Sequence, residues 1–245
     1  MTRYAMAIDL DRCMGCRACM EACKVENGTP KGSFWMYVFR LEEGTYPSSK
    51  LSFLPRPCMH CDNAPCVKVC PVGARYKRED GLVATDWARC IGCRYCEVAC
   101  PYGVNNFNWS DPAEADYLDW NEAELPGDGE SVIPPWRNPD LDEDSRPENR
   151  PIAGGGHSAG VIEKCTFCVQ RLEKGLQPAC VTNCPVDAFA FGDLDDPDSE
   201  VSRKLADKPS FRLLEEAGTE PRVYYVGDKH PEAEVHQVEA VEAKV

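Results

Sequence analysis

The sequence lacks any apolar run long enough to span a lipid bilayer, which takes about 20 residues in a helix. From Met1 it becomes polar within three residues, and its tail is acidic. It also shows no Sec-like or twin-arginine signal of its own. We therefore expect a chain that is soluble, or one that is held at a membrane only through another protein.

Basic residues are scarce relative to acidic ones: 27 Lys and Arg stand against 41 Asp and Glu, for a net charge of −14. This balance argues against a nucleic-acid partner, because nucleic acids bind in basic grooves. Catalytic groups are lacking too. No Ser/His/Asp set, paired-carboxylate site or phosphate loop stands out, and we expect a non-catalytic protein.

Cysteine, in contrast, is abundant, and all sixteen cysteines fall into four short motifs. The motifs are Cys13-x2-Cys16-x2-Cys19-x3-Cys23, Cys58-x2-Cys61-x4-Cys66-x3-Cys70, Cys90-x2-Cys93-x2-Cys96-x3-Cys100 and Cys165-x2-Cys168-x11-Cys180-x3-Cys184. Three of them end in Cys-Pro. This is the run that binds 4Fe–4S clusters in bacterial ferredoxins, where the fourth cysteine ligates the other cluster of a pair. Sixteen thiolates therefore predict four 4Fe–4S clusters, arranged as two ferredoxin pairs.

The spacing suits a cubane because Cys-x2-Cys-x2-Cys turns the backbone tightly, so that three sulfurs converge and backbone N–H groups face the anionic core. A zinc- or disulfide-stabilised interaction module is the alternative of another class. Zinc sites usually combine two cysteine pairs separated by a loop, and a third and fourth cysteine this near would crowd one ion. Disulfide frameworks are typical of short secreted chains. Brown colour and visible absorbance would separate iron–sulfur clusters from both.

Short elements are expected around the motifs, and the second and third motifs form an internal repeat. Strands are predicted over 4–10 and 81–85, the latter in a hairpin with 75–80 that closes on Asp80-Gly81. Single helical turns or short helices are predicted over 18–26, 64–69 and 95–99. Residues 193–208 predict a turn and a short helix beginning near Pro197 or Ser199, and 223–226 predict a strand. These elements indicate an α+β fold.

Residues 109–160 differ in kind from the rest of the chain. Residues 109–150 hold thirteen Asp or Glu against three Arg, and 109–160 hold seven prolines and three tryptophans. Acid and proline favour a loop, whereas the tryptophans favour contact with this chain or with a partner. Both interpretations remain open.

The histidines and two arginines beside cysteines need separate interpretation. His60 lies between Cys58 and Cys61, but its motif already has four cysteines, so we expect a local hydrogen bond rather than ligation. We expect His157, His230 and His236 to face solvent. Arg17 and Arg94, which directly follow cysteines, either offset cluster charge or face solvent.

Beyond the cysteines, several segments resemble one family. They are Arg3–Leu10 with Cys13-x-Gly-Cys16, Glu163-Lys-Cys-Thr-Phe-Cys168, Gln177-Pro-Ala-Cys180 and Phe191-Gly-Asp-Leu-Asp-Asp-Pro197. The chain resembles the iron–sulfur subunits of the molybdopterin oxidoreductases (the dimethyl sulfoxide reductase superfamily), most of all the polysulfide reductase type. Its relatives handle thiosulfate, tetrathionate, sulfite, dimethyl sulfoxide and arsenate. The resemblance covers 1–108 and 161–226 and leaves the acidic insertion without a role.

The resemblance implies which cysteines share a cluster. In it, one ferredoxin-like module is inserted within another. The implied ligand sets are Cys13, Cys16, Cys19 with Cys184; Cys165, Cys168, Cys180 with Cys23; Cys58, Cys61, Cys66 with Cys100; and Cys90, Cys93, Cys96 with Cys70. In relatives the outer pair faces the molybdenum subunit, and the Cys90 cluster lies nearest the quinone-handling membrane subunit.

Two positions bear on the electronic properties of these clusters. Lys24 follows Cys23 where the other motifs have proline, and a nearby cation should raise the potential of that cluster. Nitrate-reductase-type relatives carry tryptophan in place of a third-motif cysteine and hold a three-iron cluster there. Cys93 is present here, which indicates a complete cubane and argues against nitrate.

From the resemblance we expect two nested ferredoxin-like modules with long loops: 1–53 and 161–200 as the outer module, 54–108 as the inserted one, 109–160 as the insertion and 201–245 as an extension. The implied function is relay of single electrons between a molybdopterin (Mo or W) subunit and a polytopic quinone-binding membrane subunit. The alternative is a ferredoxin-type subunit of a formate dehydrogenase or hydrogenase. We expect attachment to a membrane through the partner, with the periplasmic face preferred over the cytoplasmic face.

Overall fold

The computed structural model describes residues 2–30, 32–109 and 157–227. Its helices are α1 (Ala18–Asn27), α2 (Pro65–Lys68), α3 (Tyr95–Val98), α4 (Val169–Leu172), α5 (Ala179–Thr182), α6 (Glu200–Asp207) and the 3-10 turn η4 (Glu215–Ala217). Its strands are β1 (Tyr4–Asp9), β2 (Tyr37–Glu43), β3 (Lys50–Arg56), β4 (Arg75–Lys77), β5 (Val83–Thr85), β6 (Asn106–Phe107), β7 (Ile162–Glu163), β8 (Phe189–Asp193), β9 (Ser210–Phe211) and β10 (Val223–Val226).

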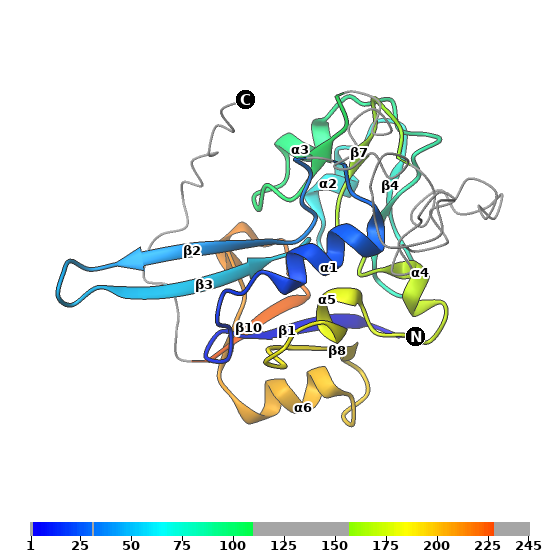
Figure 1. The fold of residues 1–245 in the computed structure, drawn as a ribbon. Helices are drawn as coiled ribbons and strands as arrows, with labels where there is room; N and C mark the ends of the chain where they lie inside the picture. Colours follow the sequence, from blue (N-terminus) through cyan, green and yellow to red (C-terminus); the bar gives the residue numbers. More distant parts are fainter. Residues whose placement is uncertain (1, 31, 110–156, 228–245) are drawn as a thin grey trace, which may run out of the picture.

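A four-stranded sheet in the order β8-β1-β10-β9 joins the two ends of the described chain. β1 pairs antiparallel with β8 and parallel with β10, so β10, which lies within the expected extension 201–245, occupies the interior of the sheet. Figure 1 shows α6 on one face of this sheet and α1 with α5 on the other. Because both faces are covered, β1 is apolar almost throughout rather than alternating.

The predicted local elements are present. The strand at 4–10, the three short helices through the cysteine motifs and the strand at 223–226 all form. β4 and β5 pair antiparallel, and Gly81 at φ +80° closes their turn as expected. The helix α6 begins after Ser199, whose side chain accepts a hydrogen bond from Ser202 N at 3.2 Å.

One large element was not predicted from the sequence. β2 and β3 pair over seven residues each and form an arm that extends away from the rest of the molecule (Figure 1). At the other side of the molecule, β6 pairs with β7 and so ties residues 106–107 to 162–163. The prediction for 109–160 and those for His230 and His236 lie almost wholly or wholly outside the described residues. No helix of the described ranges has the length and hydrophobicity needed to cross a membrane.

Candidate iron–sulfur sites

The cysteine loops converge because their backbones adopt left-handed conformations at fixed places. In the first motif Gly15 and Arg17 have φ of 71° and 64°, and in the third Gly92 and Arg94 have 67° and 59°. Such conformations reverse the chain over very few residues. A helix then begins at once, α1 or α3, and carries the third cysteine of its motif. Positive φ therefore brings three thiols of one motif to one side of the loop.

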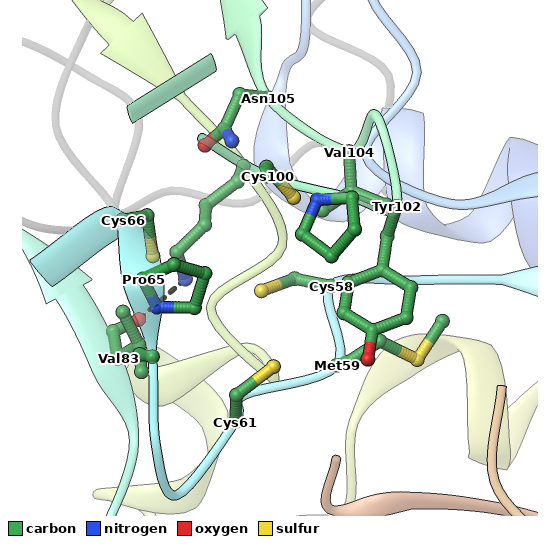
Figure 2. Close-up of a pocket in the computed structure, with 13 residues that line it drawn as sticks. Cys58, Met59, Cys61, Pro65, Cys66, Val83, Cys100, Tyr102, Val104 and Asn105 are labelled. Atoms are coloured by element: carbon green, nitrogen blue, oxygen red, sulfur yellow. Dashed lines mark hydrogen bonds between the residues drawn. The ribbon is translucent and has the colours of Figure 1, made fainter. Parts of the chain in front are cut away.

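Figure 2 shows a hollow surrounded by cysteines from two motifs. The sulfur atoms of three cysteines from the second motif and one from the third point into it: Cys58, Cys61, Cys66 and Cys100. Apolar side chains complete the lining, and the hollow measures about 330 Å³. We call this set of four cysteines site 3.

Two further hollows have the same construction. One, of about 330 Å³, is lined by the cysteines of site 4: Cys90, Cys93, Cys96 and Cys70. The other, of about 300 Å³, is lined by the cysteines of site 1: Cys13, Cys16, Cys19 and Cys184. In each, three thiols come from one motif and the fourth comes from another.

The remaining four cysteines form site 2: Cys165, Cys168, Cys180 and Cys23, all of them buried. Asn27 Nδ2 lies 3.5 Å from Cys23 Sγ and 3.8 Å from Cys168 Sγ, which places these two sulfurs side by side. Burial raises the pKa of the Cys180 thiol well above its usual value, and Cys168, Cys165 and Cys23 raise it further. The structure thus brings the sixteen cysteines together in four groups, each with three cysteines of one motif and a fourth from another.

Electrostatics show what these thiols need in order to act as ligands. Burial raises the pKa of Cys19, Cys61 and Cys165 to about 12. A metal ligand must be a thiolate, so a bound cationic centre has to supply the charge that removes each proton. Backbone N–H groups supply further stabilisation: Phe167 N lies 3.4 Å from Cys165 Sγ, and Ala188 N lies 3.3 Å from Cys184 Sγ.

The donor chemistry fits a polynuclear iron–sulfur cluster. All sixteen cysteines are free thiols, which is not a disulfide framework. Zinc would require four ligand atoms within about 2.3 Å of one ion. In sites 1, 3 and 4 the four thiols instead surround a hollow. The four-thiol hollows match a larger group with four attachment points.

His60 behaves as predicted. Its Nδ1 accepts a hydrogen bond from Val83 N at 3.1 Å, and its ring lies 4.0 Å from that of Phe167. Burial, together with the positive charge of Lys164, lowers the pKa of His60 well below its usual value. The imidazole is therefore neutral and serves packing.

The prediction for His157 was wrong, because its side chain is buried rather than in solvent, with 7% exposed. Nδ1 lies 2.7 Å from Glu163 Oε1, and Nε2 lies 2.8 Å from the carbonyl oxygen of Asn27. Its ring packs between those of Trp35 and Trp87. A carboxylate six residues away and a carbonyl 130 residues away hold it in place, and neither is visible from local sequence.

The cations beside the cysteines have distinct environments. Arg17 is exposed and lines the site 1 hollow, whereas Arg94 lines the site 4 hollow and its guanidinium lies 4.4 Å from the Trp109 ring centroid. Lys24 Nζ donates to the carbonyl oxygens of Thr29, Pro30 and Ser33. Burial lowers the pKa of Lys24 to about 8, against the opposing charge of Cys23.

Sequence reasoning missed three side chains near the sulfurs: Asn27, Arg75 and Lys164. Asn27 lies one turn beyond Cys23 on α1, and its amide faces site 2. Arg75 lies in β4, and its Nη2 donates to Cys96 Sγ at 3.4 Å. Of the three, only Lys164 could have been suspected from the sequence, because it directly precedes Cys165.

Comparison with known proteins agrees with this geometry. Two family models match, each described as a 4Fe–4S dicluster domain, one over 49–115 and 153–194 and the other over 12–74. The chain is 42% identical to the putative dimethyl sulfoxide reductase iron–sulfur subunit of Halobacterium salinarum, with 94% of this chain and 82% of that protein covered. It is 43% identical to the arsenate respiratory reductase iron–sulfur subunit of Shewanella sp. (91% and 96%). It is 37% identical to the menaquinone reductase iron–sulfur cluster-binding subunit of Nitratidesulfovibrio vulgaris (91% and 88%).

These relatives match this chain over most of their length, and each is an iron–sulfur subunit of a reductase. The structure agrees with this role, because its cysteines are free thiols and most of them line hollows. The chain belongs to the iron–sulfur, electron-transfer subunits of the molybdopterin oxidoreductases.

Proposed function

We propose that sites 1 to 4 each hold one 4Fe–4S cluster and that electrons pass through them one at a time in the order 1-2-3-4. The clusters supply the redox chemistry. The chain supplies thiolate ligands, burial and N–H donors, and carries out no bond chemistry of its own.

The order follows from contacts between the groups. Burial and the other three cysteines of site 2 are the largest causes that raise the pKa of Cys180. The next cause is Cys19, which belongs to site 1. After burial, Cys58 of site 3 is the largest cause that raises the pKa of Cys165 of site 2. Sites 3 and 4 lie where α2 packs against α3, one helix from each copy of the internal repeat, and each site takes its fourth cysteine from the other copy. Each site therefore has a neighbour, and sites 1 and 4 are the ends.

The observation that carries the proposal is where thiols reach the surface. Among the sixteen cysteines only Cys16 of site 1 and Cys93 of site 4 are exposed. A relay has to be insulated along its length and accessible at its two ends. Exposed apolar side chains surround the second end, with Ile91, Tyr95 and Val98 at 64, 62 and 86% exposed. Such patches favour a protein partner.

We infer that site 1 exchanges electrons with a molybdopterin catalytic subunit and site 4 with a quinone-binding membrane subunit. The names of the relatives support the two kinds of partner, since they include reductases of dimethyl sulfoxide and arsenate as well as a menaquinone reductase. The assignment of each partner to its site is what the family resemblance implies. The chain would then be a peripheral component of a membrane complex, on the periplasmic face in our proposal.

Reduction of the purified complex from each end tests this direction. A quinol analogue added anaerobically should bleach the cluster absorbance in the wild type. Cys93→Ser should slow that bleaching at least tenfold, whereas Cys16→Ser should leave it fast and instead slow reoxidation through the catalytic subunit. If the two variants behaved alike, or if Cys16→Ser blocked the quinol, the proposed polarity would be wrong.

A further inference from the structure

Two cations are buried between neighbouring cysteine sites. Arg75 is 2% exposed and Lys164 is 3% exposed. No carboxylate forms an ion pair with either of them among residues 2–30, 32–109 and 157–227. A buried charge without a counter-charge is strongly unfavourable. Within the described part of the chain, the side chains alone do not provide the negative charge that would balance these two cations.

Arg75 lies where sites 3 and 4 meet. Its backbone N–H lies 3.3 Å from Cys70 Sγ, and its Nη2 lies 3.4 Å from Cys96 Sγ, both of site 4. The same Nη2 donates to Asn105 Oδ1 at 2.8 Å, and Asn105 lines the site 3 hollow. Two of its donors, Nε and Nη1, are buried with no partner. The guanidinium thus has N–H groups without a hydrogen-bond acceptor, and it lies beside the sulfur atoms of site 4.

Lys164 occupies the corresponding place between sites 2 and 3. It lines the site 3 hollow, and its Nζ donates to the carbonyl oxygens of Val83 and of Cys165, a site 2 ligand. The electrostatics place both cations near site 3. Burial raises the pKa of Cys66 to about 11, and Arg75 and Lys164 both oppose that rise.

The missing counter-charge is what thiolate-ligated clusters would provide. Four thiolates around an iron–sulfur core carry net negative charge, and reduction adds one more unit. A fixed cation stabilises the reduced form more than the oxidised form, as do N–H donors to sulfur, so both raise the reduction potential.

We propose that Arg75 and Lys164 are bridging cations, each of which raises the reduction potentials of the two clusters that it lies between. Arg75 acts on sites 3 and 4, and Lys164 acts on sites 2 and 3. The inference rests on the proposed function, because it requires that the sites hold clusters.

Redox titration of the assembled complex, followed by EPR, tests the proposal. Arg75→Gln removes the charge, and Arg75→Lys retains it without the planar fork of donors. We expect Arg75→Gln to lower the equilibrium constant for reduction at site 4 by roughly tenfold or more, which is 59 mV for one electron. Site 3 should move in the same direction, sites 1 and 2 should stay in place, and Arg75→Lys should recover most of the shift.

Lys164→Met provides the matched comparison, because its expected shift falls on sites 2 and 3 and spares site 4. Lys50→Gln, at the exposed far end of the projecting arm where β3 begins, also removes one positive charge and should move no site. Iron content of each variant shows whether it has assembled. If Arg75→Gln does not assemble, Lys164→Met still tests whether loss of a bridging cation lowers the potentials of the two sites beside it.

The outcomes separate the inference from the function on which it rests. Wild-type protein without four cluster signals would contradict the proposed function. Four clusters with unshifted potentials in fully loaded Arg75 and Lys164 variants would contradict only the bridging role. A uniform shift at all four sites would also contradict it, since a general loosening of the fold would have that effect.

Discussion

Sites 3 and 4 and sites 1 and 2 are built from the same motif in opposite ways. The cysteines of sites 3 and 4 all lie within residues 58–100, in a tandem repeat supported by one small hairpin. Sites 1 and 2 draw their cysteines from both ends of the described chain, which the sheet that pairs β1 with β8 and β10 holds together. A ferredoxin-like site can therefore be formed by cysteines close in the sequence or by cysteines far apart in it. In the second case the site depends on a sheet that holds the distant segments together.

The largest expected effect comes from breaking that scaffold. Ile8 in β1 is fully buried, and Ile8→Asp would bury an unpaired charge at a cost on the order of 4 kcal/mol. We expect loss of the clusters at sites 1 and 2 before those at sites 3 and 4, measured as iron per chain during mild denaturation. Leu51→Asp on the exposed arm is the control. Simultaneous loss of all four clusters would remove the distinction between the two halves.

Removal of the fourth ligand compares the two architectures directly. Cys19 and Cys184 of site 1 are 165 positions apart, whereas Cys66 and Cys100 of site 3 are 34 apart. Closing the longer loop restricts the unfolded chain by about 1.4 kcal/mol more, from the logarithmic dependence on loop length. Cys184→Ala should therefore reduce the free energy of unfolding more than Cys100→Ala, in denaturant titrations of anaerobic protein. Equal losses would show that loop closure does not distinguish them.

The helix that covers the sheet offers a smaller change confined to the outer half. Ser199 Oγ caps α6 and also donates to Asp193 O at 2.7 Å. Ser199→Ala should cost about 1 kcal/mol, seen as a lower midpoint for loss of sites 1 and 2. Ser199→Thr, which retains the hydroxyl, should restore most of it. An unchanged midpoint in the alanine variant would mean that the cap does not contribute.

The smallest expected effect is a pH dependence at the contact between α1 and β7. Burial opposes a charged His157, but the hydrogen bond and charge of Glu163 outweigh it and raise the pKa of His157 above its usual value. Both ring nitrogens face acceptors, as an imidazolium requires.

A raised pKa in the folded state stabilises the protein below the unfolded pKa of about 6.5. That contribution is lost as the pH rises through the higher folded value. His157→Gln should flatten this decline in stability between mildly acidic and mildly alkaline pH. A variant that keeps the wild-type pH profile would exclude His157 as its source.

Local sequence predicted the parts of the fold that local interactions determine. The turn at Gly81, the helices that carry cysteines and the cap at Ser199 depend on residues within a few positions, and the structure contains all three. The arm formed by β2 and β3 was missed because six residues without a tight-turn dipeptide separate its strands. The burial of His157 and of Arg75 depends on partners far along the chain, and no local pattern marks it.

The central claim is that the chain holds four 4Fe–4S clusters, two in a local module and two across its length. Iron and acid-labile sulfide, measured per chain on anaerobically purified complex, test it most directly once iron and sulfide of any partner subunit are subtracted. The account predicts about sixteen of each per chain. About eight of each, or a few zinc atoms in their place, would contradict it.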